Sequence, residues 1–200
     1  MTAPRLTFWY EFASTYSYLT AMRIEAAAEA AGVTVDWQPF LLGPIFKSQG
    51  WATSPFNIYP AKGRYMVRDI GRIAASRGLK FEMPEPFPAN ALKAARLAIA
   101  GIGDGWVAPF TRAVFEAEFA RGLDISSEEV LTGLLATLGL DAPTAIARSN
   151  EPGTKERLRA VTAEEAKGIF GAPSFVAPDG ELFWGDDRLE AALAHVISKT

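Results

Sequence analysis

Two kinds of hydrophobic pattern follow one another along this chain. Residues 6–10 and 33–40 are short apolar runs rich in aromatic and β-branched residues, which is typical of strands. The run between them, residues 18–31, consists mainly of Ala, Leu, Met, Glu and Arg, which favours a helix that stops near Gly32. We therefore expect a β-α-β opening with parallel strands.

Helical patterns fill the middle of the chain. We expect these helices over residues 44–48, 61–77, 91–100, 106–121, 127–138, 142–148 and 152–167. A loop rich in Gly and Pro separates the first two helices, and three prolines mark residues 81–88 as a connector. Asn90 is a suitable N-cap for the third helix. The helix over 61–77 places Tyr65, Ile70 and Ile73 at helical spacings, opposite a basic face.

Strand patterns return near the C-terminus. Residues 174–177 and 181–184 flank a Pro-Asp-Gly turn, which predicts a hairpin, and a closing helix follows over 188–198. The order βαβ, helical block, ββα predicts an α/β fold, namely a thioredoxin-like domain with a large all-helical insertion. Residues 1–42 and 168–200 would form the thioredoxin-like domain, and residues 43–167 the insertion.

The composition narrows the class of protein. The chain has 200 residues, 49% of them hydrophobic, so one sizeable core is expected, and its net charge of −3 predicts no general attraction to nucleic acid or to anionic membranes. No apolar run is long enough to span a membrane and no leader pattern is present, so we expect a cytoplasmic protein. With no cysteine and one histidine, disulfides, thiol nucleophiles and Cys- or His-based metal sites are excluded.

The tetrapeptide Ser14-Thr15-Tyr16-Ser17 lies between the first strand and the first helix. A thiol-disulfide oxidoreductase places its CxxC motif at such a junction, whereas two serines stand at that spacing here. The simplest interpretation is helix capping by Ser14. The functional alternative is a hydroxyl that donates a hydrogen bond to an anion, in which case any sulfur must arrive with a ligand. A serine nucleophile is disfavoured because the single histidine, His195, lies in the last helix.

Two further sequence features can be structural or functional. Residues 171–175, Gly-Ala-Pro-Ser-Phe, are either a simple turn or a cis-proline at Pro173 that exposes the backbone of Ala172 to an extended peptide. Asp186 and Asp187 precede the last helix. One of them is expected to cap this helix, and the other could accept a hydrogen bond from a ligand's ammonium group.

A basic run follows the Pro-rich loop, and most of it is expected to be a solvated helical face. Its members are Lys62, Arg64, Arg68, Arg72 and Arg77. Lys62 differs from the others because it lies at the N-terminal end of the expected helix, where a cation is unfavourable for the helix dipole. This mismatch favours a ligand carboxylate near Lys62.

Six motifs in the same order give the chain a resemblance to a known family. They are FASTYSYL (12–19), LLGPIFK (41–47), SPFNIYPAKGRYMVRD (54–69), FPANALKAARLA (87–98), GIFGAPSFV (168–176) and FWGDDRLE (183–190). With these motifs the chain resembles the 2-hydroxychromene-2-carboxylate isomerases, within the kappa-class glutathione transferase and DsbA-like group. The resemblance covers almost the whole length.

The resemblance implies glutathione as a bound cofactor and gives individual residues their expected roles. Ser14 would bind the glutathione sulfur, Ala172 with Pro173 would pair with the cysteinyl backbone, and Lys62 would meet a ligand carboxylate. The remaining expected contacts are Asp186 and Asp187 at the γ-glutamyl end, Asn57 as a further polar contact to the cofactor, and Lys47, Phe46 and Asn90 toward the substrate.

The activity implied by the resemblance is glutathione-dependent isomerisation. It interconverts 2-hydroxychromene-2-carboxylate and trans-o-hydroxybenzylidenepyruvate, a step of aromatic catabolism, by reversible addition of a thiolate. Two alternatives stay open: a kappa-like glutathione transferase, and a non-catalytic domain that binds a peptide or a thiol. The expected partners are glutathione and a small aromatic or enone acid, and a homodimer is expected from the resemblance alone.

The chain departs from the family pattern at two positions. Thr15 stands where the family usually has Pro, which leaves the turn less rigid without removing the hydroxyl of Ser14. Ala52 stands where related chains often have Asn, so ligand binding there would be weaker or would pass through Asn57. An aromatic substrate could meet any of several rings, whose position the sequence leaves open: Trp9, Phe46, Trp51, Phe56 and Tyr59.

Overall fold

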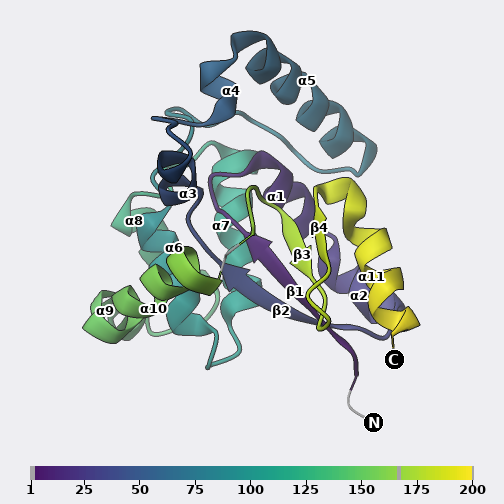
Figure 1. Ribbon diagram of the computed structural model, residues 1–200. Helices are drawn as coiled ribbons and strands as arrows, with labels where there is room; N and C mark the ends of the chain where they lie inside the picture. Colours follow the sequence, from purple (N-terminus) through teal and green to yellow (C-terminus); the bar gives the residue numbers. More distant parts are fainter. Residues whose placement is uncertain (1–2, 166–167, 200) are drawn as a thin grey trace.

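A mixed four-stranded sheet lies at the centre of the protein (Figure 1). The computed structural model describes residues 3–165 and 168–199. Its strands follow the order β2-β1-β3-β4, with bounds β1 (Arg5–Tyr10), β2 (Thr34–Pro39), β3 (Ser174–Val176) and β4 (Leu182–Trp184). β1 pairs in parallel with β2 and antiparallel with β3, and β3 and β4 form a hairpin. The predicted parallel opening and the predicted hairpin are both confirmed.

Helices cover the sheet and extend beyond it. They are α1 (Thr15–Ala21), α2 (Ile24–Ala30), α3 (Leu42–Ser48), α4 (Pro55–Ile58), α5 (Pro60–Ser76), α6 (Leu92–Gly101), α7 (Val107–Arg121), α8 (Glu128–Thr137), α9 (Ala142–Asn150), α10 (Pro152–Ala160), the π-helical η1 (Val161–Glu165), the 3₁₀ turn η2 (Asp186–Arg188) and α11 (Leu189–Ser198). In Figure 1, α6 and α8 to α10 gather on one side, α11 lies on the other, and α4 with α5 forms an arm above the strands.

The helix expected over residues 18–31 was wrong in its detail, because two helices occupy this part of the chain. α1 already starts at Thr15. The helical conformation is then interrupted at Arg23, and α2 begins at the next residue. The Arg23 side chain reaches across to the carboxylate of Asp186, 163 residues further on. The break therefore coincides with a tertiary ion pair, which no local sequence pattern signals.

The arm formed by α4 and α5 also differs from the expectation. The loop expected before residue 61 contains α4, whose first turn is capped by the Ser54 hydroxyl. α5 matches the predicted helix, but its buried face consists of Met66, Ile70 and Ala74, spaced four residues apart. Tyr65, which we expected on the apolar side, is 59% exposed.

The start of α6 and the end of α10 also differ from the expectation. Asn90 was expected as the N-cap of α6, but the cap is Ala91, and the Asn90 side chain instead accepts a hydrogen bond from the Leu92 N–H at 3.2 Å. The helix expected over 152–167 continues into η1, and residues 166 and 167 lie outside the described part of the chain. The expected division into two domains stays a prediction.

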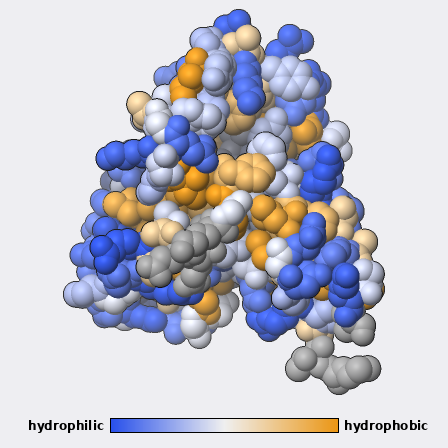
Figure 2. All heavy atoms as spheres, in the orientation of Figure 1, coloured by the Kyte–Doolittle hydropathy of each residue, from blue (hydrophilic) through white to orange (hydrophobic). Residues whose placement is uncertain are grey.

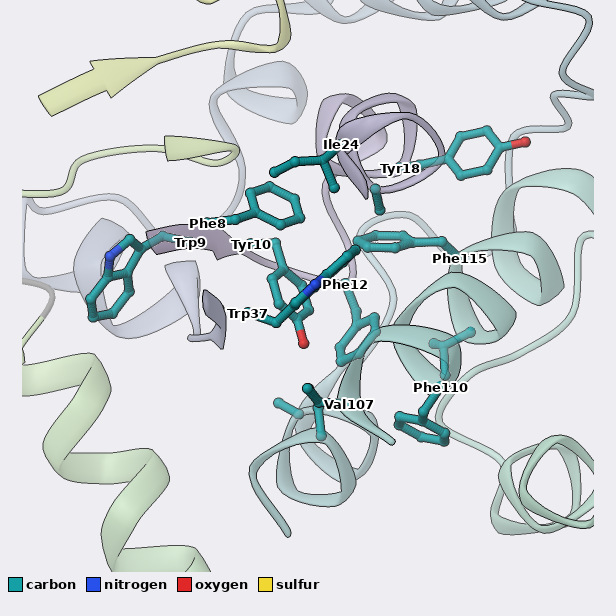
Figure 3. Packing of buried hydrophobic residues seen from close by; sticks show 14 of the residues in the cluster. Phe8, Trp9, Tyr10, Phe12, Tyr18, Ile24, Trp37, Val107, Phe110 and Phe115 are labelled. Atoms are coloured by element: carbon teal, nitrogen blue, oxygen red, sulfur yellow. The ribbon is translucent and has the colours of Figure 1, made fainter. Parts of the chain in front are cut away.

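Aromatic side chains form the centre of the core (Figure 3). Tyr10 and Phe12, at the end of β1, contact Phe115 of α7 with ring centroids 6.1 and 5.3 Å apart. The buried Tyr10 hydroxyl also shares a 2.7 Å hydrogen bond with Thr111 of α7. One cluster of buried side chains thus joins the sheet to the inserted helices. The same strand end leads directly into the turn that carries Ser14.

We predict that Phe115→Ala lowers the free energy of unfolding by about 3–5 kcal/mol, because truncating a fully buried ring removes contacts and leaves a cavity. Urea unfolding followed by circular dichroism and by tryptophan fluorescence measures the change. Phe170→Ala is the matched control, since its ring is 48% exposed and its loss should cost about 1 kcal/mol or less. A cost for Phe115→Ala no larger than that of the control would contradict a shared core.

Candidate functional site

A large cavity opens where β1 ends and β3 begins. Its volume is about 1190 Å³, and its walls come from five parts of the chain: the turn before α1, α3 with the loop to α4, α5, residues 87–92, and the segments on either side of the β3–β4 hairpin. Figure 2 shows apolar side chains gathered across the middle of the molecule, below the arm of α4 and α5. The cavity therefore lies between the thioredoxin-like part and the inserted helices, which is a common position for a ligand site.

Ser14 is the N-cap of α1 and lines this cavity. Its hydroxyl oxygen accepts a hydrogen bond from the Ser17 N–H at 3.2 Å, and the hydroxyl donates one to the Ala172 carbonyl at 3.0 Å. The capping interpretation is thus correct, and the hydroxyl faces the cavity as well. Ser17 is fully buried and lies outside the cavity lining.

The segment before β3 has the conformation that we expected. The peptide bond between Ala172 and Pro173 is cis, and both residues line the cavity opposite Ser14. The Pro173 carbonyl accepts a hydrogen bond from the Gly185 N–H at 3.0 Å, which ties this segment to the end of β4. The Ala172 carbonyl, by contrast, is held by a hydroxyl that can rotate.

The two adjacent aspartates have different environments. The Asp186 side chain is 6% exposed, and its carboxylate accepts hydrogen bonds from Arg77 at 2.6 Å and Arg23 at 3.2 Å. Thr20 of α1 donates a third hydrogen bond at 3.0 Å. Burial opposes ionisation of Asp186, but the two arginines outweigh it, so its pKa lies below the usual value. Arg77 is therefore an exception to the solvated basic face that we expected.

Asp187 keeps its carboxylate available to the cavity. Its side chain is 73% exposed and pairs with the neighbouring Arg188 at 2.6 Å. Both residues line the cavity. An exposed ion pair of this kind contributes little and exchanges partners easily, so Asp187 can accept a ligand's ammonium group.

α5 contributes one cation and one hydrogen-bonded cluster to the opposite wall. Lys62 is exposed, lines the cavity and makes no ion pair among the described residues. Asp69 accepts hydrogen bonds from Tyr16 at 2.9 Å and from Tyr65 at 3.4 Å. Burial and the Asp69 carboxylate raise the pKa of Tyr16, which therefore stays a neutral hydroxyl. Tyr16, Tyr65 and Asp69 all line the cavity, although the sequence analysis did not single them out.

The aromatic residues that we considered for contact with the substrate fall into cavity-lining residues and one core residue. Phe46, Trp51, Phe56 and Tyr59 line the cavity, and the rings of Phe46 and Trp51 contact each other at 5.7 Å. Trp9 belongs to the core, with 6% of its surface exposed. The sequence analysis missed a second aromatic pair on the opposite wall, Phe170 and Trp184, whose centroids are 5.0 Å apart.

Of three further polar residues that we expected to contact a ligand, one lines the cavity and two do not. Asn90 lines the cavity, whereas Lys47 and Asn57 do not. The Asn57 amide donates to Thr53 at 3.2 Å and to the Phe87 carbonyl at 3.4 Å, so it links α4 to the connector. The roles expected for Lys47 and Asn57 stay predictions.

The two departures from the family pattern also lie at this site. Ala52 lines the cavity, so a longer side chain at that position would reach into it. Thr15 is buried, and its hydroxyl donates to the Met66 sulfur of α5 at 3.4 Å. Thr15 therefore gives the turn a contact to the arm that a proline could not provide.

Glu11 is a cavity residue that the sequence analysis overlooked. It is 6% exposed and lies three residues before Ser14, at the end of an apolar strand where a charge is unusual. One carboxylate oxygen accepts a hydrogen bond from the Leu42 N–H at 2.8 Å, and the other from the Ala13 N–H at 3.4 Å. Burial raises the pKa of Glu11 to about 7, although the backbone hydrogen bonds oppose this shift.

The arrangement suits a ligand that has an extended backbone and charged groups of both signs. It offers a hydroxyl, a cis-proline edge, an exposed carboxylate and a cation around an aromatic cavity. Over residues 3–165 and 168–199 no group of His, Cys, Asp and Glu side chains could hold a metal ion. Within the same residues, none of the helices has the length and apolar character that crossing a membrane requires.

Comparison with known proteins agrees with the resemblance drawn from the motifs. A family profile described as DSBA-like thioredoxin domain matches residues 5–196. The 2-hydroxychromene-2-carboxylate isomerase of Sphingobium xenophagum is 29% identical over 197 residues, which cover 96% of this chain and 97% of that protein. The protein of the same name from Pseudomonas putida is 26% identical over 186 residues, or 91% of this chain and 89% of that one.

Solved structures confirm the fold. A 2-hydroxychromene-2-carboxylate isomerase structure superimposes with a TM-score of 0.85 at 22% identity, covering 98% of this chain and 97% of that one. The cytosolic disulfide reductase DsbM from Pseudomonas aeruginosa, solved with GSH, has a TM-score of 0.63 at 20% identity, with 98% of both chains covered. The predicted α/β fold, a thioredoxin-like domain with a helical insertion, is thus confirmed.

We predict that Asp186→Asn lowers the free energy of unfolding by about 1–3 kcal/mol at pH 7, because two arginines lose the buried charge that they share. The pKa of Asp186 is lowered in the folded protein, so its ionised form stabilises the fold above the ordinary pKa of an aspartate. This contribution disappears as the pH falls through the folded-state pKa.

Urea unfolding of the wild type and the variant at several pH values tests this prediction. The difference between them should shrink below about pH 4. Asp187→Asn, at the exposed neighbouring position, should leave stability nearly unchanged at every pH. Equal effects of the two substitutions would contradict the role of Asp186 as a buried anchor.

Proposed function

The chain belongs to the DSBA-like thioredoxin domain family, and on this basis we propose that it is a glutathione-dependent isomerase. Its substrate pair would be 2-hydroxychromene-2-carboxylate and trans-o-hydroxybenzylidenepyruvate. Relatives that match over nearly their whole length carry the name of this isomerase, which supports the reaction type. DsbM, a structural relative, is described with GSH, which supports the choice of thiol.

The observation that carries the proposal is the position of Ser14 against the cis-proline edge. A hydroxyl that can donate a hydrogen bond lies 3.0 Å from the carbonyl of Ala172, at the wall of a cavity that is otherwise largely apolar. Because the chain has no cysteine, thiol-disulfide exchange by its own residues is excluded. A thiol chemistry at this site therefore depends on a thiol that binds there.

The residues of the cavity fit glutathione in charge and in hydrogen bonding. The exposed carboxylate of Asp187 suits the ammonium group of the γ-glutamyl end, and Lys62 suits a carboxylate. The Ala172 backbone suits a peptide that pairs as an extra strand. When bound, glutathione would supply a thiolate that adds to the conjugated double bond, allows rotation about the resulting single bond, and leaves unchanged.

The present hydrogen bonds of Ser14 explain how its hydroxyl would become available. In the structure the hydroxyl donates to the Ala172 carbonyl. A backbone N–H of a paired ligand would take over this carbonyl, so the Ser14 O–H would be released toward the sulfur. Ser14 would keep the hydrogen bond that it accepts from the Ser17 N–H, because that bond uses a lone pair of the oxygen.

The enone acid would lie against the aromatic walls. The pair Phe46 and Trp51 faces the cavity from the insertion, and the pair Phe170 and Trp184 faces it from the thioredoxin-like part. These walls would exclude water from the double bond, and excluding water strengthens the hydrogen bond from Ser14 to a charged sulfur.

We keep the prediction of a cytoplasmic dimer as part of the proposal.

Two alternatives remain to be separated from this proposal by experiment. A kappa-like glutathione transferase would use the same residues to make a lasting conjugate. Glutathione consumed in a one-to-one ratio with the acceptor would identify a transferase, whereas unchanged glutathione with turnover identifies an isomerase. Calorimetry that detects peptide binding, but no glutathione binding at millimolar concentration, would instead identify a non-catalytic binding domain.

We predict that Ser14→Ala raises the thiol pKa of bound glutathione by about 1–2 units, because a hydrogen bond to a charged group contributes about 1.5–3 kcal/mol. The isomerisation rate at neutral pH should fall about 10- to 100-fold. Ultraviolet absorbance of the thiolate, titrated with saturating glutathione, measures the pKa.

Ser17→Ala is the matched control for Ser14→Ala. The Ser17 hydroxyl is buried without a hydrogen-bond partner in the described chain, so its removal should leave the thiol pKa and the fold intact. An unchanged thiolate titration in Ser14→Ala, or an equal shift in both variants, would sink the assignment of Ser14.

We predict that Lys62→Met weakens glutathione binding about 2- to 5-fold, since an ion pair at an exposed position contributes up to about 1 kcal/mol. The binding should also lose part of its dependence on salt. Calorimetry at low and high ionic strength measures both effects. Arg64→Met, on the same helix but outside the cavity lining, should bind as the wild type does, and equal losses would indicate a general charge effect.

A further inference from the structure

The helix that forms one wall of the cavity, α3, has no fully buried residue among its seven. Two hydrogen bonds hold its start: the Leu41 N–H donates to the Thr162 hydroxyl of η1 at 3.3 Å, and the Leu42 N–H donates to the Glu11 carboxylate at 2.8 Å. Leu42 and Ile45 of α3 pack against the core while staying half-buried, so the two hydrogen bonds at its start add substantially to this apolar hold.

The Glu11 carboxylate connects the two parts of the site that the proposed reaction needs. Its other oxygen accepts the Ala13 N–H at 3.4 Å, and its backbone carbonyl accepts the Ser14 N–H at 3.0 Å. Glu11 thus organises the turn that presents Ser14. On the other side it holds the helix that carries Phe46 of the aromatic wall.

We propose that Glu11 is a positioning residue whose charge sets how firmly α3, and with it the substrate wall, is held against the Ser14 turn. The substrate part of this inference rests on the proposed function. The ionised carboxylate accepts stronger hydrogen bonds than the neutral acid does. Protonation therefore loosens the hold on Leu42 and widens the cavity at its α3 wall.

The groups around Glu11 are consistent with a change of charge near neutral pH. Burial places its pKa at about 7. Glu118 of α7 faces it electrostatically, and burial, together with the charge of Glu11, raises the pKa of Glu118 well above the ordinary value. The raised pKa of Glu118 favours its neutral form. Among the side chains that the structure describes, Thr162 of η1 contributes a neutral hydroxyl to the start of α3, and Leu42 of α3 contributes its backbone N–H to Glu11.

The direct test follows the amide resonances of Leu42 and Ala13 by NMR while the pH is changed, without any ligand. In the wild type both should titrate with a midpoint near the pKa of Glu11, about 7. In Glu11→Gln, which keeps the length of the side chain but cannot ionise, this midpoint should be absent. Hydrogen exchange at Leu42, corrected for the intrinsic rate, should be slower at pH 8 than at pH 6 only in the wild type.

Two control variants separate charge from packing. Thr162→Val removes the other hydrogen bond to α3 without a titratable group, so it should speed exchange at Leu41 and keep the midpoint at Leu42. Glu118→Gln imitates the neutral acid and should leave the midpoint unchanged. A Leu42 resonance that does not titrate in the wild type, or that still titrates in Glu11→Gln, overturns the inference.

The kinetic test applies once turnover is established. From pH 8 to pH 6 the KM for the aromatic acid should rise about 2- to 10-fold in the wild type, the range expected for one weakened hydrogen bond. In Glu11→Gln the KM should not depend on pH over this range, while the thiol pKa of bound glutathione stays as in the wild type. If the protein does not isomerise the acid, the proposed function fails, and the NMR result still decides the role of Glu11.

Discussion

The antiparallel pairing of β1 with β3 is the constraint on which the site depends. Its register sets Trp9 opposite Ser174 and Phe8 opposite Phe175. The chain leaves β1 and enters β3 at the same edge of the sheet, so the Ser14 turn and the cis-proline segment must meet there. The 3.0 Å hydrogen bond from Ser14 to Ala172 joins residues 158 positions apart in the chain. A slip of this register would separate them and would turn the aromatic side chains of β1 out of the core.

Charged and polar contacts hold the arm of α4 and α5 in addition to the buried face of α5. Arg77, at the C-cap of α5, pairs with buried Asp186, and Asp69 in the middle of the helix accepts the Tyr16 hydroxyl. Both bonds reach α5 from the thioredoxin-like part, on the two sides of the cavity. The position of Lys62 at the cavity therefore depends in part on an ion pair and a hydrogen bond formed further along the helix.

The two buried carboxyl groups at the site, Asp186 and Glu11, have pKa values shifted in opposite directions, because their partners differ. Asp186 has two arginines and a hydroxyl as partners, so its charge is stable and its pKa is low. The partners of Glu11 within the described part of the chain are backbone N–H groups, which do not fully offset burial, so its pKa lies near neutrality. Ionising Glu11 as the pH rises costs the fold some of its stability while it strengthens the local bond to Leu42. The first carboxylate anchors the structure, and the second can respond to pH.

The sequence by itself determined the order of the strands, the hairpin, the N-cap position of Ser14 and the absence of any thiol chemistry of the chain's own, and it offered the cis-proline as one of two interpretations. These follow from local patterns and from composition, because strand, turn and capping preferences act over a few residues. The tertiary structure alone decided the break at Arg23, the pairing of Arg77 with Asp186, the burial of Trp9 and the place of Glu11 in the cavity wall. Each depends on a partner distant along the chain, or on which face of an element is covered, and no local pattern encodes either.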